Sequence, residues 1–499
     1  MIQAWNDFVP GAYGPTLLNL FSENVAAVSE RRFVKTDKVD FSYGQMGRIV
    51  ASIAKELPDD LPGRSVVFYM PNSASFIAAF YAVIARGGVP TPVNFAVPVA
   101  GVRQTISHFD VALAITAVPG ISDGPELVLD DATLSIRADF IGELPANANP
   151  DDDAVHLFSG GTTGVPKRIR HSHRTLMATV ERMEWCWPTE DGDVWLALAP
   201  FSHVWGLVMA VLNPQVNRCS LILPEKFHPA DVVALMEEER VSVLGGGPPA
   251  IYQALLADET FADRDFSALR VCPGGGAPFP AAVHKRWTEA TGVRIVEAVG
   301  MTEVAPISVN NDKHGPRTGT VGRPVPNTEV QVVDLNTGMQ VMPPDMPGEL
   351  RIRGPQMMLE YKDNPEETAR TIRDGWIYSG DIGTMDADGY LTITDRRKDL
   401  IIHQGYNVFP REVEECVLHY PGVVAVGVVG VPDERSGERV VCYAVMRGNG
   451  SAEDIRAYCA SELPGYKVPS EIFIVDELPM TPARKLDRVQ LRALAKDTL

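Results

Sequence analysis

The sequence predicts an α/β fold: a large N-terminal domain of layered α/β subdomains plus a small β unit, followed by a small α/β domain at the C-terminus. Short apolar runs that end at polar or proline residues are typical of buried strands in parallel sheets, and the chain contains SVVFYM (65–70), VALAIT (111–116) and VWLALAP (194–200). The segment SASFIAAFYAVIARGG begins with a helix-capping serine, Ser73, and ends at Gly87, so it predicts a helix between the first two runs. This alternation indicates βαβ units.

The second half of the chain has a different residue pattern. The segments GTVGRPVPNTEVQVVD and GELRIRGPQMMLEY combine glycine, proline and alternating β-branched residues, which predicts a smaller all-β unit. Further on, the apolar run VVAVGVVGV (423–431) and a capping box opened by Ser451 and Asp454 predict a separate α/β domain. We place the boundary at the charged run DRRKD, which gives an N-terminal domain (1–395) and a C-terminal domain (396–499).

Composition and charge favour an acidic cytoplasmic protein. The 499 residues carry a formal net charge of −19 at pH 7, which disfavours nucleic acids and anionic membranes as partners, although solubility alone also favours an acidic surface. The six cysteines include no C-x-x-C pair, so we expect reduced thiols and no zinc site. The first residues lack the pattern of a signal peptide, and the apolar runs are too short to span a bilayer. We expect a monomer or homodimer.

The stretch SGGTTGVPK, from Ser159 to Lys167, has the residue types of a ligand-binding loop. Its glycines let backbone N–H groups approach a ligand closely, its hydroxyls add donors, and Lys167 adds a positive charge. These features suit a loop that wraps phosphate oxygens, although a tight turn would also use the glycines. The spacing differs from the common P-loop, in which the lysine directly follows a glycine.

Two further motifs support a nucleotide site. VGMTE follows the apolar run VRIV, so Thr302 and Glu303 are expected just beyond a strand end, where open α/β sheets bind ligands. Beside a phosphate loop, Glu303 becomes a candidate Mg²⁺ ligand, whereas alone it would be a solvated carboxylate. In YSGDIG, a glycine-flanked turn is expected to present Asp381 to ribose hydroxyls, or else Asp381 simply stabilises that turn.

Together these motifs resemble the adenylate-forming superfamily, which includes acyl-CoA synthetases, luciferases and peptide-synthetase adenylation domains. The first 150 residues carry no motif but have the expected length and texture. The resemblance runs in family order from there to the C-terminus, through SGGTTGVPK, PFSHVWGL (200–207), PGGGAPFP (273–280), VGMTE, YSGDIG, DRRKDLIIHQGYNVFPREVEE (395–415) and LPMTPARKLDR (478–488).

The resemblance implies a role for each matching residue. The β- and γ-phosphates of ATP are held by Ser159, Gly160, Gly161, Thr162, Thr163, Gly164 and Lys167. Thr302 contacts the α-phosphate, Glu303 binds Mg²⁺, and Lys485 bridges the substrate carboxylate and the α-phosphate. Lys398 is the hinge between the domains. The adenosine is held by Gly276, Ala277, Pro278, Asp381 and Arg396, with Gly275 beside them.

The block PFSHVWGL bears on the class of acid. Phe201 stands where amino-acid-activating relatives place an aspartate, which disfavours an α-amino acid, so we expect a fatty or aryl acid. A lone histidine or tryptophan is often a core residue, but the family places His203 beside the substrate carboxylate, and we favour a pocket role for Trp205 as well. The expected acyl pocket comprises His203, Val204, Trp205, Gly206, Gly246, Gly275, Gly276 and Met301.

The resemblance implies an acid–thiol ligase: a carboxylate and ATP give an acyl-adenylate and pyrophosphate, and CoA then gives the thioester. Because the carboxylate and the phosphate are both negative, catalysis requires charge neutralisation by Mg²⁺ and a mobile lysine. The acceptor could instead be an amine or a carrier-protein thiol. A non-catalytic relative that only binds nucleotide or acyl ligand is disfavoured, since it needs no mobile lysine.

Several residues depart from the family pattern and indicate a specialised member. Val299 stands where most relatives have a tyrosine that stacks on adenine. The other departures are Arg168, Glu360, Asp395, Ile402 and Arg484.

Overall fold

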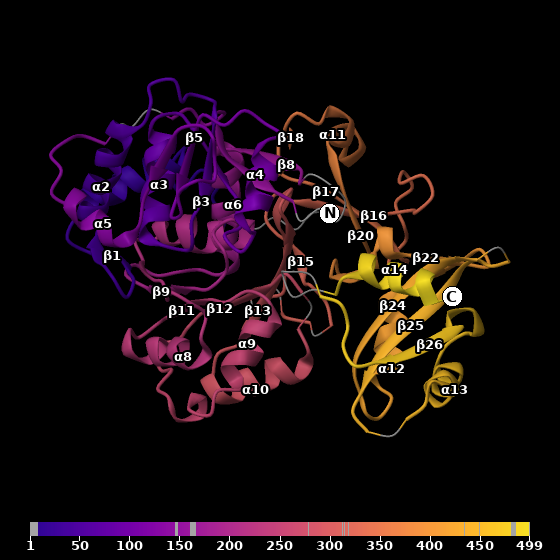
Figure 1. Ribbon diagram of the computed structural model, residues 1–499. Helices are drawn as coiled ribbons and strands as arrows, with labels where there is room; N and C mark the ends of the chain where they lie inside the picture. The colour runs from indigo at the N-terminus through magenta and orange to yellow at the C-terminus, as the bar shows by residue number, and fades with distance from the viewer. Residues whose placement is uncertain are drawn as a thin grey trace. The chain divides into compact units, whose positions relative to one another are not determined.

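The computed structural model describes residues 8–144, 148–159, 166–277, 279–311, 313, 315–317, 319–433, 435–448, 450–480 and 486–498 (Figure 1). The chain forms two compact units, Met1–Val330 with Ile352–Ile377, and Gln331–Arg351 with Tyr378–Leu499. The boundary expected between residues 395 and 396 falls inside the second unit. The expected boundary stays a prediction.

One sheet of the first unit confirms the predicted βαβ arrangement. Ser73 caps the helix between its strands, since its Oγ accepts a hydrogen bond of 3.1 Å from Phe76 N, and every residue of that helix is buried. The helix ends before Gly87, whose φ of +70° suits the turn that follows. The parallel strands lie in the order β4-β3-β5-β6: β3 (Ser65–Tyr69), β4 (Val89–Pro92), β5 (Leu113–Thr116) and β6 (Glu126–Val128), with α3 (Ala74–Ala85) and α4 (Val99–Ile106) between them.

A second sheet contains the predicted strand at 194–200. Its order is β11-β9-β10-β1-β2, parallel except for β2, and its strands are β1 (Arg32–Lys35), β2 (Asp40–Ser42), β9 (Val194–Ala197), β10 (Ser220–Ile222) and β11 (Val243–Gly245). The helices near these two sheets are α1 (Leu17–Ala27), α2 (Tyr43–Glu56), α5 (Asp131–Leu134), α6 (His173–Cys186), α8 (Pro229–Glu238) and α9 (Pro249–Leu256).

Two smaller sheets carry the predicted phosphate and metal residues. In the first, antiparallel strands lie in the order β18-β8-β7: β7 (Asp153–Phe158), β8 (Arg168–Ser172) and β18 (Glu360–Tyr361). The second has the order β12-β13-β14-β15: β12 (Cys272–Gly275), β13 (Ile295–Met301), β14 (Val304–Val309) and β15 (Arg323–Pro324), with α10 (Ala281–Thr291) before β13. The segment after β18 continues into α11 (Pro365–Thr371).

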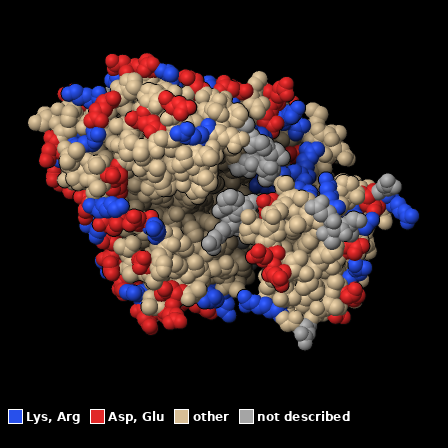
Figure 2. All heavy atoms as spheres, viewed as in Figure 1, with Lys and Arg blue, Asp and Glu red and all other residues tan. Residues whose placement is uncertain are grey.

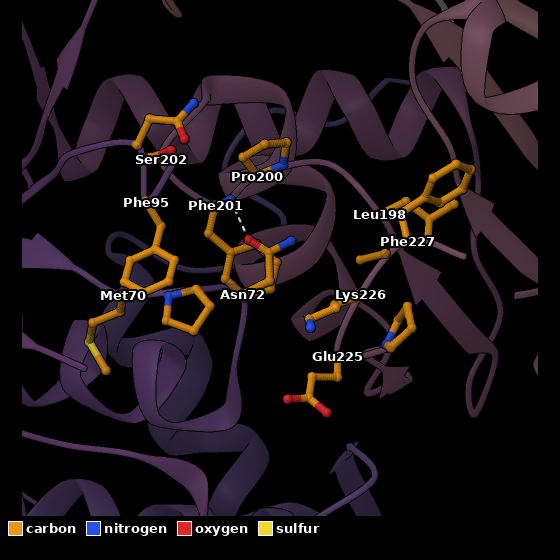
Figure 3. A pocket seen from close by; sticks show the side chains of 14 residues that line it. Met70, Asn72, Phe95, Leu198, Pro200, Phe201, Ser202, Glu225, Lys226 and Phe227 are labelled. Atoms are coloured by element: carbon orange, nitrogen blue, oxygen red, sulfur yellow. Dashed lines mark hydrogen bonds between the residues drawn. The ribbon is translucent and has the colours of Figure 1, made fainter. Parts of the chain in front are cut away.

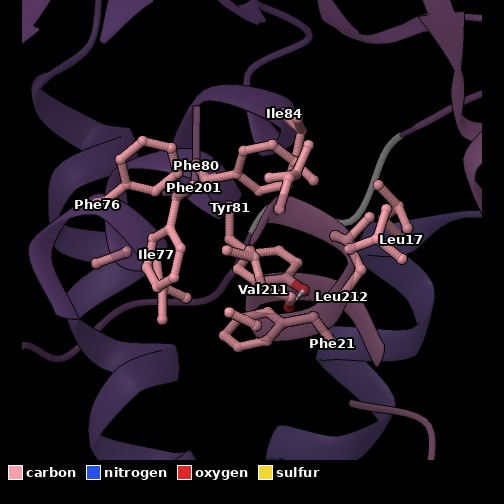
Figure 4. Close-up of a cluster of buried hydrophobic side chains, with 14 of the residues drawn as sticks. Leu17, Phe21, Phe76, Ile77, Phe80, Tyr81, Ile84, Phe201, Val211 and Leu212 are labelled. Carbon is pink, nitrogen blue, oxygen red and sulfur yellow. Dashed lines mark hydrogen bonds between the residues drawn. The ribbon is translucent and has the colours of Figure 1, made fainter. Parts of the chain in front are cut away.

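The core of the first unit is aromatic and fixes the block PFSHVWGL (Figure 4). Phe21 stacks on Tyr81 with ring centroids 4.1 Å apart, and the Tyr81 hydroxyl donates to Val211 O at 3.1 Å. Phe201 is 1% exposed and packs edge-on against Phe76, with centroids 5.3 Å apart. Aromatic pairs of this geometry stabilise a core beyond their buried area. Phe201 therefore anchors the segment that leads to His203.

The remaining strands confirm a β unit followed by an α/β domain. The β unit has the order β16-β17-β20-β19, with β21 beside β20: β16 (Glu329–Val333), β17 (Gly348–Arg353), β19 (Ile372–Arg373), β20 (Trp376–Met385) and β21 (Leu391–Arg396). The last sheet has the order β23-β22-β25-β24, with β26 parallel to β25: β22 (Ile401–His403), β23 (Tyr406–Val408), β24 (Val423–Asp433), β25 (Gly437–Met446) and β26 (Glu471–Val475). Its helices are α12 (Pro410–Leu418), α13 (Ala452–Glu462) and α14 (Arg488–Thr498). The predicted capping box of Ser451 and Asp454 begins α13.

Charged side chains of both signs are interspersed over the face that Figure 2 shows. Within the described ranges, no helix combines the length and the hydrophobicity needed to cross a membrane. The six cysteines are free thiols.

Candidate active site

The predicted phosphate loop connects the antiparallel strands β7 and β8. Ser159 N donates to Lys167 O at 3.0 Å, which ties the two ends of the loop together. The Ser159 Oγ atom is buried and has no hydrogen-bond partner among the described residues. A buried hydroxyl of this kind is suited to a ligand oxygen. The other predicted loop ligands, Gly160, Gly161, Thr162, Thr163 and Gly164, lie outside the described residues.

Lys167 has two neighbours that its sequence position did not indicate. Its ammonium group forms an ion pair with Glu367 in α11, and it lies over the ring of Tyr361, 5.0 Å from the centroid. The Lys167 side chain is 36% exposed. The lysine is therefore held at the end of the loop while remaining accessible to an anion.

Thr302 and Glu303 form the connection between β13 and β14, which confirms that they follow a strand end. Glu303 is 8% exposed, and its Oε1 accepts a hydrogen bond of 2.7 Å from the Tyr361 hydroxyl. Its backbone oxygen accepts from Met358 N at 2.7 Å. Burial, followed by the charge of Glu303, raises the pKa of Tyr361, so the phenol stays a donor. Tyr361 thus contacts both Lys167 and the candidate metal ligand.

His171 holds the backbone of Thr302. Its Nε2 lies 2.8 Å from Thr302 O, and its Nδ1 lies 3.1 Å from Thr175 Oγ1. A carbonyl oxygen can only accept, so Nε2 carries the proton and donates to Thr302 O. Burial lowers the pKa of His171 to about 4, which keeps this neutral tautomer. The connection that carries Thr302 and Glu303 is therefore fixed from strand β8.

We expect acid to destabilise the protein through His171 and its neighbour His173. Burial lowers the pKa of both imidazoles to about 4, from an ordinary value of 6.5. Between these values the unfolded chain binds more protons than the folded protein does. The free energy of unfolding should therefore fall as pH drops from 6.5 towards 4, by up to about 3 kcal/mol for each histidine.

Urea unfolding at pH 7 and pH 5 measures this loss. The H171Q variant has no imidazole to protonate, so it should lose less stability than the wild type between the two values. The exposed His228 gives the matched control, because H228Q should lose as much as the wild type. A loss in H171Q equal to that of the wild type would contradict the buried, neutral state of His171.

The predicted ribose pair is brought together in the second unit. Asp381 in β20 faces Arg396 in β21, and the Arg396 Nε lies 2.7 Å from the Asp381 Oδ1. The prediction that Asp381 lies in a tight turn is wrong, because β20 runs continuously through YSGDIG. Gly383 is needed within the strand instead, because a Cβ there would lie 2.3 Å from Thr392 O, beside a register shift, whereas Gly380 has a φ of +70°.

Lys398 lies, exposed, in a short 3₁₀ turn, Arg397–Asp399, between β21 and β22. The neighbouring Asp399 is buried and pairs with Arg492 at 2.6 Å. Asp395 is also buried and accepts from Arg411 N at 2.9 Å, at the start of α12. The exposed Lys398 thus lies between two buried aspartates, Asp395 and Asp399, that are held by hydrogen bonds or ion pairs. Its hinge role stays a prediction, and Lys485, the predicted catalytic lysine, lies outside the described residues.

Four residues of the expected acyl pocket, Trp205, Gly206, Gly246 and Gly275, are closely packed, and Trp205 lies against Gly275. The indole packs edge-on against Trp187, with centroids 5.5 Å apart, and a Cβ on Gly275 would lie 2.8 Å from Trp205 Cζ3. A Cβ on Gly206 would lie 2.0 Å from Pro200 O, and one on Gly246 would lie 2.8 Å from the Tyr252 ring. These glycines are needed for close packing. Val204 and Gly206 form the short helix α7 (Val204–Gly206) with Trp205.

The other predicted pocket residues are more open. His203 is exposed and caps α7, since its Nδ1 accepts from Trp205 N at 3.2 Å. Gly276, with φ of +81°, and Ala277 are exposed beyond the end of β12, and Met301 is half-buried at the end of β13. Pro278 lies outside the described residues. The structure thus brings Trp205 and Gly275 together and leaves His203 on the surface.

A cavity of about 190 Å³ adjoins the loop that carries Phe201 (Figure 3). It adjoins the carboxyl ends of β3, β4, β9 and β10. Asn72 fixes this loop, because its Nδ2 donates to Ala199 O at 2.8 Å and its Oδ1 accepts from Phe201 N at 2.9 Å. Pro200, Phe201 and Ser202 of the block PFSHVWGL line this cavity, but no lining residue was assigned to the expected pocket, although the polar residues that follow strands could have indicated the cavity. Its polar lining comprises Asn72, Asn94, Ser202, Glu225 and Lys226.

Comparison with known proteins places these features in one family. The sequence family described as AMP-binding enzyme matches residues 21–362, and the AMP-binding enzyme C-terminal domain matches residues 412–485. The long-chain-fatty-acid–CoA ligase of Bacillus subtilis is 31% identical over 480 residues, which cover 86% of this chain and 85% of the ligase. A feruloyl-CoA synthase of an Amycolatopsis species is 32% identical over 464 residues, which cover 90% and 93% of the two chains.

Solved structures agree with this placement. ATP-bound MatB from Rhodopseudomonas palustris superposes with a TM-score of 0.86 at 27% identity, and the match covers 96% of this chain and 99% of MatB. The amide bond synthetase McbA from Marinactinospora thermotolerans superposes with a TM-score of 0.81 at 26% identity, over 96% and 99% of the two chains. The chain therefore belongs to the AMP-binding enzymes, the adenylate-forming superfamily that its motifs resemble.

Proposed function

We propose that the protein uses ATP to convert a hydrophobic carboxylic acid, fatty or aryl, into an acyl-adenylate and pyrophosphate, and then transfers the acyl group to CoA. The observation that carries this proposal is the convergence of Lys167 and Glu303 on Tyr361 beside the phosphate loop. A cation and a carboxylate held in this way suit a metal-bound triphosphate. The named activities of the two sequence relatives support both classes of acid.

The residues of this chain supply positive charge and orientation for the first step. A carboxylate oxygen attacks the α-phosphorus, and the bond from that phosphorus to the leaving pyrophosphate breaks. Lys167 and Ser159 hold the leaving phosphates, and Thr302 orients the α-phosphate, because His171 fixes its backbone. Lys485 balances the charge between the attacking carboxylate and the α-phosphate.

Glu303 is suited to bind a magnesium ion. Glu303 offers a carboxylate held by one donor, and no described residue bonds to its Oε2. Mg²⁺ prefers one or two carboxylate oxygens together with phosphate oxygens. Glu303 would hold the ion, which when bound neutralises phosphate charge.

The acceptor step uses the second part of the chain. Lys485 and the hinge Lys398 lie on the segment that we expect to move, so the catalytic lysine leaves after the adenylate forms and the acceptor can approach. Asp381 and Arg396 hold the ribose throughout. The burial of Phe201 supports an acid without an α-amine, because no carboxylate occupies that position. Free thiols support a cytoplasmic location.

Product mass spectrometry tests the proposal. The purified protein is incubated with ATP, Mg²⁺ and a panel of fatty, cinnamic and benzoic acids, with and without CoA. We expect acid-dependent AMP together with acyl-CoA. Absence of AMP with every acid would contradict the activation step.

An amide synthetase is the second candidate, and the similarity to McbA favours it. The same panel with added amines separates the two. An acyl-adenylate that persists with CoA but disappears with an amine, leaving an amide, would replace the CoA proposal.

A further inference from the structure

Three basic residues, at the end of the phosphate loop and just after it, form ion pairs with acidic residues of one segment, 360–367. Strand β18 is hydrogen-bonded to β8, since Leu359 N donates to Arg170 O at 2.9 Å. This pairing aligns the two sets of charges. The ion pairs are Lys167 with Glu367, Arg168 with Asp363, and Arg170 with Glu360.

The first of these pairs involves a predicted phosphate ligand, and its acidic partner is held in place. Asn364 caps the start of helix α11, since its Oδ1 accepts from Glu367 N at 3.1 Å. The next residue, Thr368, accepts from Tyr361 N at 3.0 Å, which joins the helix start to β18. Glu367 also lies 3.7 Å from Arg370. Its carboxylate is therefore fixed opposite the Lys167 ammonium.

This ion pair is exchangeable. The side chains of Lys167 and Glu367 are 36% and 25% exposed, so solvent screens their attraction. A polyphosphate carries several negative charges and attracts an ammonium group more strongly than one carboxylate does. Lys167 is thus expected to leave Glu367 when a polyphosphate enters the loop and to return when it departs.

We propose that Glu367 is a positioning residue that competes with bound polyphosphate for Lys167 and thereby promotes the release of pyrophosphate. In the absence of nucleotide, Glu367 keeps the lysine at the mouth of the loop. After adenylation it recovers the lysine, which weakens the hold on pyrophosphate. This inference rests on the proposed function, because it treats Lys167 as a polyphosphate ligand.

Equilibrium titration with inorganic pyrophosphate and Mg²⁺, without acid or ATP, tests the proposal on the full-length protein. The E367Q variant removes the competing charge with little change of shape, so it should bind pyrophosphate about two- to five-fold more tightly than the wild type. Pyrophosphate should inhibit its turnover at correspondingly lower concentration. The matched control is E366Q, since Glu366 is 86% exposed and lies 3.9 Å from Arg370. It should bind as the wild type does.

Unchanged or weaker binding by E367Q would overturn the role of Glu367. The variant K167A distinguishes an error in the role of Glu367 from an error in the proposed function. It removes Lys167, the residue for which Glu367 and pyrophosphate are proposed to compete. It should bind pyrophosphate more weakly than the wild type. If K167A binds as tightly as the wild type, Lys167 is not a phosphate ligand and the proposed phosphate site fails. If K167A is weakened while E367Q is unchanged, only the competition fails.

Discussion

Replacement of Lys485 by alanine is expected to reduce acyl-adenylate formation by about 100- to 1000-fold, the usual effect of removing one charge-stabilising group from a transition state. The ammonium group offsets the repulsion between the attacking carboxylate and the α-phosphate, and neither substrate depends on it for most of its binding. ATP affinity should therefore change little. Acid-dependent exchange of labelled pyrophosphate into ATP measures the loss, and direct titration measures ATP binding.

Lys496 in α14 provides the matched control, because it is an exposed lysine of the same C-terminal segment. The K496A variant should exchange label at the wild-type rate. Exchange by K485A at that rate would show that another group stabilises the transition state. Loss of ATP binding in K485A would instead assign this lysine to substrate binding.

The E303Q variant is expected to require about 100-fold more Mg²⁺ for half-maximal activity, since removing a metal ligand costs at least as much as removing its supporting partner. The amide keeps the shape of the side chain and can still accept from the Tyr361 hydroxyl, but it lacks the negative charge. The measurement is the rate of adenylate formation as a function of Mg²⁺ concentration at saturating ATP.

An exposed glutamate controls for the change of charge. Glu289 in α10 is 64% exposed, and its one ion pair among the described residues is a long contact, 3.9 Å, with Lys285. The E289Q variant should keep the wild-type Mg²⁺ dependence. If E303Q also keeps it, the carboxylate of Glu303 is not a metal ligand, and the Tyr361 contact is structural.

The α/β layers could be predicted because a strand buried on both faces is apolar along its whole length. The runs at 65–70 and 194–200 contain β3 and β9, and the helix capped by Ser73 lies between β3 and β4. Thr302 and Glu303 could be placed because they directly follow such a run. In these cases the residues of a single segment were sufficient to predict the strand or helix that the segment forms.

The partners of these residues could not be predicted in the same way. Tyr361 lies 58 residues from Glu303 in the sequence, and Glu367 lies 200 residues from Lys167. A tyrosine or a glutamate carries no local signal of such a contact, which depends on the pairing of β18 with β8. Asp381 was misplaced for a related reason: glycines beside a polar residue indicate a turn, but in β20 Gly383 allows a neighbouring strand to approach closely and Gly380 has a φ of +70° within the strand.

The packing of Trp205 has a consequence for which acids fit. Its indole fills the space between Trp187 and the backbone of Gly275, where the resemblance expects the acyl group to extend. We therefore expect the Trp205 indole to limit how far an acyl group extends in this direction. We expect selectivity for the length of the acid to depend on the rotamer of this one side chain.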